Sequence, residues 1–127
     1  MKTAAFHDPV YNFTVHLLWE SDGPQSAAYM RTNFPEVEVD KTDEDDEWGG
    51  RHMMLEFSRD GKNHEIHLVM LRDFQGTIED VSVLVHELIH ATHDVLYSRG
   101  LKLTDDTVEA YAYLHDSLVR RCLEALK

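Results

Sequence analysis

The chain has little cysteine and no long apolar run, and each shortage excludes a class of protein. The single cysteine, Cys122, excludes an internal disulfide and suits a reducing compartment. No stretch is long and apolar enough to span a membrane, and the first eight residues contain no apolar signal segment. We therefore expect a cytoplasmic protein without a membrane partner.

Positive charge is also scarce, because 12 lysines and arginines stand against 24 acidic residues, which gives a net charge of −12. This balance disfavours a nucleic-acid partner bound through a basic patch. The densest acidic segment runs from Asp40 to Glu47, and its simplest interpretation is a solvated loop. A calcium-type site and a surface that mimics DNA remain as alternatives, although the spacing does not match an EF-hand.

The most informative feature that is present is the H-E-x-x-H motif His86-Glu87-Leu88-Ile89-His90. Residues four apart lie on one face of a helix, so both imidazoles can approach one metal ion. The glutamate is rotated off that face and can reach a water on the metal. Two neutral nitrogen ligands, a general base and an open coordination position are the parts that zinc-dependent hydrolysis needs.

The residues around the motif predict a helix from Thr77 to Arg99. Thr77 suits an N-cap, acidic residues follow it in the first turn, and Gly100 suits a C-terminal stop. Apolar residues recur at helical spacing at Ile78, Val81, Val85, Leu88, Ile89 and Leu96. The motif therefore lies in mid-helix, where its two histidines can act together.

A catalytic zinc site needs a third protein ligand, and three positions are candidates for that role. His93 lies seven residues after His86, a rise of roughly 10 Å along a helix, which is too far for one ion. The position that a metzincin would use is Leu96. Glu109 follows His90 by nineteen residues and opens a second helical pattern.

The H-E-x-x-H motif, followed at this distance by the helical segment Glu109-x-x-Ala112-Tyr113, resembles the gluzincin branch of zinc metallopeptidases. The resemblance covers Thr77 to Leu118. It implies that His86, His90 and Glu109 bind one zinc ion, and that Glu87 is the general base that activates the zinc-bound water. In size and motifs the chain is also similar to the small metallopeptidases encoded by tailed phages, which implies action in the host cytoplasm.

Tyr113 lies four residues past Glu109 and should share its helix face. Its hydroxyl would then be placed to stabilise the oxyanion that forms during hydrolysis, and the alternative is a tyrosine at the edge of the core. Asp94 and Asp116 can each hold a ligand histidine by accepting its second N–H, or can be solvated acids. His52 is isolated on a predicted strand, and we interpret it as structural or surface-exposed.

The remaining pattern predicts strands followed by long helices. We expect strands at 11–19, 36–39, 52–57 and 64–71, a short helix at 25–33, a hairpin turn at Asp60-Gly61 and a last helix at 104–126. This order predicts a single α+β domain over residues 1–127, with a small, mainly antiparallel sheet packed against the motif helix and a second C-terminal helix. The resemblance implies the same minimal zincin-like architecture, in which we expect 64–71 to be the edge strand beside the substrate.

We therefore expect a zinc metallopeptidase that binds one zinc ion and hydrolyses a protein or peptide substrate. The first alternative is a catalytically inactive protein with a zincin fold that binds a host factor through its acidic surface. Its motivation is the small size of the chain, which leaves few residues beyond the ligand helix for substrate binding. The second alternative is an acidic mimic of nucleic acid, motivated by the charge of −12 alone.

Overall fold

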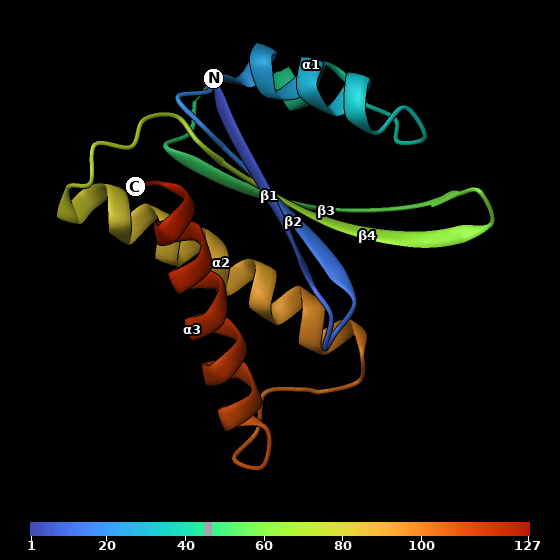
Figure 1. Ribbon diagram of the computed structural model, residues 1–127, viewed down its shortest axis with the longest axis vertical. Coiled ribbons are helices and arrows are strands. Elements are labelled where there is room, and N and C mark those ends of the chain that lie inside the picture. The colour runs from blue at the N-terminus through green and yellow to red at the C-terminus, as the bar shows by residue number, and fades with distance from the viewer. Residues whose placement is uncertain (45–46) are drawn as a thin grey trace.

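The computed structural model describes residues 1–44 and 47–127 and shows a small α+β domain. Within these residues it contains a four-stranded, mostly antiparallel sheet and three α-helices (Figure 1). In chain order the elements are β1 (Lys2–Asp8), β2 (Phe13–Trp19), α1 (Gly23–Asn33), the 3₁₀ turn η1 (Lys41–Glu44), β3 (Gly50–Arg59), β4 (Lys62–Leu71), α2 (Ile78–Ser98) and α3 (Val108–Ala125). The predicted fold class is confirmed.

The strands lie in the order β1-β2-β4-β3, so β1 and β3 are the edges of the sheet. β1 pairs antiparallel with β2 and β3 with β4, whereas β2 and β4 run parallel. The prediction that 64–71 is the edge strand is therefore wrong, because β4 lies between two neighbours. The six residues from Ile66 to Leu71 are all buried, and burial on both faces is typical of an inner strand.

Two other predictions about strands are wrong. The sequence pattern predicts no strand at Lys2–Asp8. The structure has β1 there, because all seven of its residues pair with β2. Conversely, residues 36–39 form no strand, since the Val37 N–H donates to the Phe34 carbonyl in a turn. Within the predicted acidic loop, Lys41–Glu44 form η1, and Asp45 and Asp46 lie outside the described residues.

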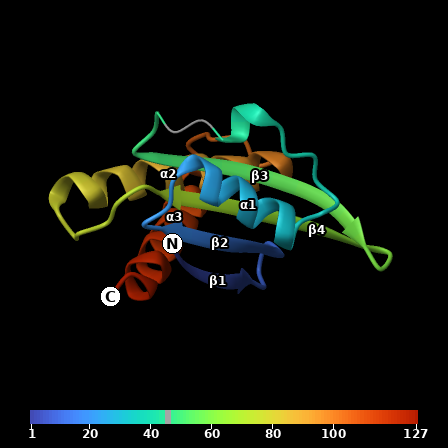
Figure 2. The same cartoon turned by 90° about the horizontal axis from the view of Figure 1, so that it is seen from above.

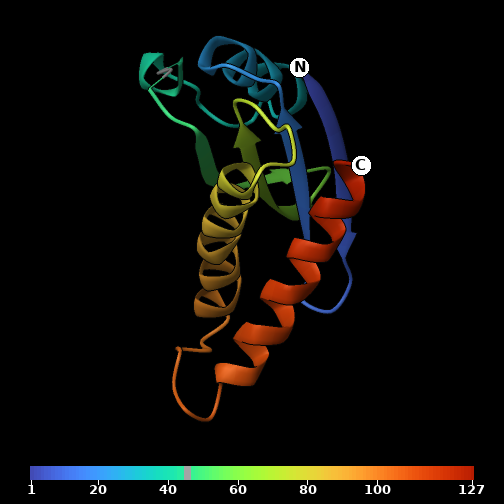
Figure 3. The same cartoon turned by 90° about the vertical axis from the view of Figure 1, so that its left-hand side faces the viewer.

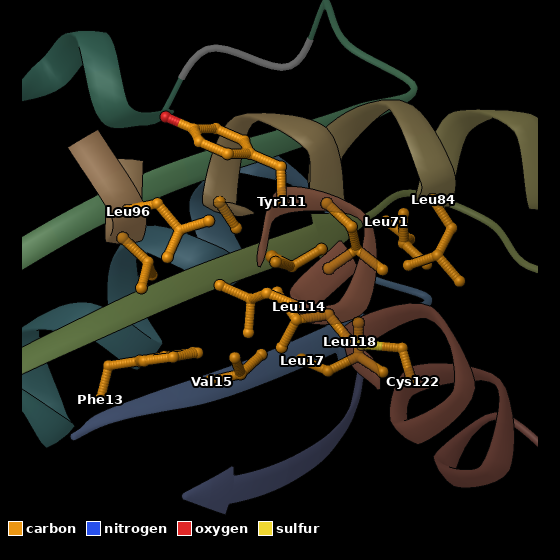
Figure 4. Packing of buried hydrophobic residues seen from close by; sticks show 14 residues of the cluster. Phe13, Val15, Leu17, Leu71, Leu84, Leu96, Tyr111, Leu114, Leu118 and Cys122 are labelled. Atoms are coloured by element: carbon orange, nitrogen blue, oxygen red, sulfur yellow. The ribbon is translucent and has the colours of Figure 1, made fainter. Parts of the chain in front are cut away.

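Helices cover both faces of the sheet, with α1 on one face and α2 and α3 on the other (Figure 2). The core under α1 consists of Leu18, Ala27, Met30, Phe34, Leu55, Ile66, Leu68 and Met70. The larger core, under α2 and α3, draws side chains from β2, β4 and both helices (Figure 4). Full burial of one large apolar side chain contributes about 1.5–3 kcal/mol, so the larger core holds α2 firmly on the sheet.

The sequence defines both ends and the buried face of α2. The Thr77 side chain accepts a hydrogen bond from the Asp80 N–H, and Asp80 accepts one in return from the Thr77 N–H. Gly100 ends the helix with φ +80°, a value that glycine adopts without strain. The buried residues Leu84, Leu88, Ala91 and Val95 recur at helical spacing and turn the opposite face of the helix outward. The predicted motif helix is confirmed.

Candidate metal and catalytic site

His86 and His90 lie one turn apart on the outward face of α2, and their side chains converge. Their Nε2 atoms are 3.3 Å apart, and both residues are exposed. Two nitrogens bound to one tetrahedral zinc ion at about 2.0–2.1 Å lie about 3.3–3.4 Å from each other. The separation of the two Nε2 atoms therefore fits a shared metal ion, as the motif predicts.

Glu87 lies on the side of α2 that faces the edge strand β3, and it is 9% exposed. A Cβ atom added at Gly50 of β3 would lie 3.2 Å from Cγ of Glu87, which shows how closely the strand approaches this side chain. Burial raises the pKa of the Glu87 carboxyl, while the neighbouring His86 and His90 act in the opposite direction. A carboxylate with a raised pKa is a better proton acceptor, as a general base requires.

Glu109 and Tyr113 lie on one face of α3, as predicted, but both are exposed to solvent. The cause is Tyr111, which is buried and donates a hydrogen bond to the Leu101 carbonyl at 2.6 Å. Residues that are two positions apart in the sequence point about 200° away from each other around a helix. A buried Tyr111 therefore turns Glu109 and Tyr113 outward. Tyr113 is 73% exposed. Its predicted role in stabilising an oxyanion stays a prediction.

The structure does not bring Glu109 together with the histidine pair. In residues 1–44 and 47–127, no three His, Cys, Asp or Glu side chains are grouped closely enough to hold a metal ion. α3 runs back alongside α2 (Figure 3), and the ring of Tyr111 lies 6.4 Å from the ring of His93. The residues thus fit zinc as two nitrogen ligands, and the assignment of Glu109 as the third stays a prediction.

His52 is not isolated, contrary to the interpretation from the sequence. Its Nε2 atom lies 2.9 Å from Nδ1 of His67 on β4, and Nε2 of His67 lies 2.9 Å from Oε2 of Glu65. Glu65 in turn pairs with Arg99 at 3.2 Å. On its other side, Nδ1 of His52 faces Oδ2 of Asp94 on α2 at 3.7 Å. A chain of polar side chains therefore runs beneath α2, from Arg99 at the end of this helix, through β4 and β3, to Asp94.

Both histidine side chains of this chain are buried, and burial favours the neutral form of each. Burial, with smaller contributions from His67 and His90, lowers the pKa of His52 to about 4, although Asp94 acts in the opposite direction. Burial also lowers the pKa of His67, and the hydrogen bond to Glu65 opposes that effect. His52 contacts the motif helix at Asp94, which lies one helical turn after His90.

The two other histidines near α2 take part in packing. His93 is exposed and stacks on Tyr97 with ring centroids 5.3 Å apart. Nε2 of His115 on α3 lies 3.3 Å from the Val85 carbonyl. Neither joins the histidine pair as part of a three-residue group in the described chain.

No family model, curated protein or solved structure matches the chain. The likeness to gluzincins therefore rests on the motif residues. None of the described helices combines the length and apolar character needed to cross a membrane.

Proposed function

We propose that this protein is a zinc-dependent metallopeptidase that hydrolyses peptide bonds in the cytoplasm, with His86 and His90 as ligands and Glu87 as the general base. The observation that carries the proposal is the 3.3 Å separation of the two Nε2 atoms beside the buried residue Glu87. A zinc ion held there would polarise a carbonyl and acidify a water molecule. We expect one ion for each chain, with Glu109 as its third protein ligand.

Glu87 performs the proton transfers in this proposal. Its carboxylate accepts a proton from the attacking water and passes that proton to the nitrogen of the leaving amine. Because burial raises its pKa, the protonated form is easier to reach during the reaction. Burial causes this rise, and the charges of His86 and His90 oppose it.

The edge strand β3 supports a peptide as the substrate. It pairs with β4 along one side only, and its other side is an edge of the sheet next to α2. An extended peptide can add to such an edge through backbone hydrogen bonds. The close approach of β3 at Gly50, where an added Cβ atom would lie 3.2 Å from Cγ of Glu87, supports a substrate strand next to the proposed base.

The test is a comparison of Glu87→Gln with the wild type after zinc reconstitution. We expect both to hold about one zinc ion, because glutamine leaves the two imidazoles in place. Hydrolysis of a peptide library, followed by mass spectrometry, should fall by about 10²–10⁴-fold in Glu87→Gln. Glu79→Gln, which removes an exposed acid from the first turn of the same helix, serves as the control. Full hydrolysis by Glu87→Gln would contradict the assigned base.

An inactive zincin-fold protein that binds a host factor through its acidic surface is the second candidate. The observation that favours it is that the described residues bring no third ligand to His86 and His90. Zinc, if held by the pair, would then stabilise the fold without catalysis. Capture of the same partner by wild type and Glu87→Gln, with the partner left uncleaved by both, would favour this candidate over the peptidase.

A further inference from the structure

The far end of the β3–β4 hairpin projects beyond α2 (Figure 1), and a cleft of about 540 Å³ lies against it. The polar side chains that line this hairpin cleft come from both strands, from the loop between β1 and β2, and from the end of α2. They include Asn12, Glu56, Ser58, Asn63, Glu65 and Arg99. The proposed hydrolysis uses none of them, so the cleft needs an explanation of its own.

Two acids of the hairpin cleft face each other across the strands. Glu56 on β3 is in direct register with Glu65 on β4, and residues in direct register lie on the same face of a sheet. Two like charges in this arrangement repel each other and destabilise the pairing of the strands. The fold alone therefore gives no reason for a second acid at this position.

The two carboxylates differ in their partners. The Glu65 carboxylate lies 2.9 Å from Nε2 of His67 and 3.2 Å from the Arg99 guanidinium. Arg99 also donates to two backbone carbonyls, so its donors are used within the protein. Glu56 is exposed and, among residues 1–44 and 47–127, its side chain forms no hydrogen bond or ion pair. The charge that the hairpin cleft offers to a ligand is therefore negative.

Neutral acceptors lie beside the Glu56 carboxylate. Ser58 and Asn63 are the next pair of residues on the same face of the hairpin, and both line the hairpin cleft. An ammonium group has three N–H donors and no acceptor, and a guanidinium group likewise only donates. A carboxylate with a hydroxyl and an amide oxygen beside it therefore suits the charged end of a lysine or an arginine.

β3 connects the hairpin cleft with the proposed catalytic site. Gly50, which approaches Glu87 closely, and Glu56 are six residues apart on this strand, so they face the same side of the sheet. At about 3.3 Å for each residue, the strand spans about 20 Å between them. A peptide that adds to the free edge of β3 would therefore pass the hairpin cleft about six residues from the bond that is cleaved.

We propose that the hairpin cleft is a specificity site, which binds a lysine or arginine side chain of an extended peptide substrate about six residues from the cleaved bond. The bound cation relieves the repulsion between Glu56 and Glu65 and donates to Ser58 and Asn63. The net charge of −12 attracts basic peptides in general, whereas the cleft selects the position of the charge in the peptide. This inference rests on the proposed function for the cleaved bond, but binding of the basic side chain requires no metal ion.

The first experiment measures binding by fluorescence anisotropy, on protein kept free of metal by a chelator. Its probes are two labelled, threonine-rich decapeptides that differ at one central position, which is lysine in one and glutamine in the other. The wild type should bind the lysine peptide about 3–10-fold more tightly than the glutamine peptide. Glu56→Gln should bind both peptides alike. Its thermal midpoint should also rise by about 1–4 °C, because the repulsion across the hairpin is removed.

Glu38→Gln is the matched control, because it makes the same change at an exposed acid outside the hairpin cleft. It should keep the preference of the wild type for the lysine peptide. A second experiment locates the basic residue by cleavage of a peptide library after zinc reconstitution. Wild type and Glu38→Gln should favour bonds about six residues from a lysine or arginine, and Glu56→Gln should lose this preference.

The outcomes separate the inference from the proposed function. Equal binding of both peptides by the wild type would overturn the inference. An equal loss of preference in Glu56→Gln and Glu38→Gln would also overturn it, because it would show only a general attraction to the acidic surface. Cleavage without a preference for a basic residue would overturn it and leave the peptidase standing. A lysine preference that Glu56→Gln loses, without cleavage by the wild type, would support the cleft and remove the peptidase.

Discussion

Acid should destabilise the metal-free protein before most of its carboxylates are protonated, because His52 is buried as a neutral side chain. Its pKa is lowered from 6.5 to about 4 in the folded state. Between these two values the unfolded chain binds more protons than the folded protein does. The free energy of unfolding must therefore fall as the pH falls through this window. Above the window, the titration of His52 adds no pH dependence to it.

The magnitude follows from the difference between the two pKa values. At about 1.4 kcal/mol for each pH unit, His52 alone should remove about 3 kcal/mol between pH 6.5 and pH 4. His67 acts in the same direction, because burial lowers its pKa too. Glu87 acts in the opposite direction, since its raised pKa favours the folded state as the pH falls. The free energy of unfolding of a small domain is about 5–15 kcal/mol, so the loss caused by His52 is a large share of the total stability.

The assay is urea unfolding from pH 7 to pH 4.5 in the presence of a chelator, which keeps any metal off the histidines. The wild type should lose stability steadily over this range, and His52→Asn should lose less, because asparagine does not titrate. His64→Asn should follow the wild type, since His64 stacks on Phe57 on the other face of the sheet. A flat profile for the wild type, or the full slope in His52→Asn, would refute the reasoning.

Four further outcomes are expected from the structure. Gly50→Ala should cost about 1–3 kcal/mol in thermal unfolding, because its Cβ would lie 2.5 Å from Cγ1 of Val83, and adding Val83→Ala should restore most of the loss. Cys122 should resist alkylation in the native protein and react in urea, as mass spectrometry would show, because burial raises the pKa of its thiol to about 12. Thr77→Ala should cost about 1 kcal/mol in urea unfolding by removing the cap of α2, whereas Thr77→Ser should be nearly neutral. Glu109→Ala should reduce the zinc content measured by elemental analysis, and an unchanged content would exclude Glu109 as a ligand.

Features that depend on local sequence were predictable. The limits of α2 follow from Thr77 and Gly100, and the convergence of His86 and His90 follows from helical geometry alone. The order of the strands was not predictable in this way, because it depends on pairing between distant segments. β1 shows the difference, since its own residues are mostly exposed and the strand exists through its pairing with β2.

The approach of His52 to His67 was accessible from the sequence through the hairpin turn. Asp60 and Gly61 both have positive φ, as the predicted two-residue turn requires. That turn fixes the register that pairs His52 with Val69 and Met54 with His67. His52 and His67 are then diagonal neighbours on one face, within reach of each other. What the register does not reveal is that α2 covers this face and presents Asp94 to the end of the chain.

The position of Glu109 limits how it can reach the histidine pair. Rotating the whole of α3 would bring Tyr111, Leu114 and Leu118 out of the core, at about 1.5–3 kcal/mol for each side chain. A change confined to the first turn is cheaper, because Thr107 makes no side-chain cap to the helix. The hydrogen bond from the Tyr111 hydroxyl to the Leu101 carbonyl would still hold α3 in place about one turn after the start of the helix. Loss of zinc from Glu109→Ala would therefore point to a rearranged first turn on a fixed α3, with the core beneath it unchanged.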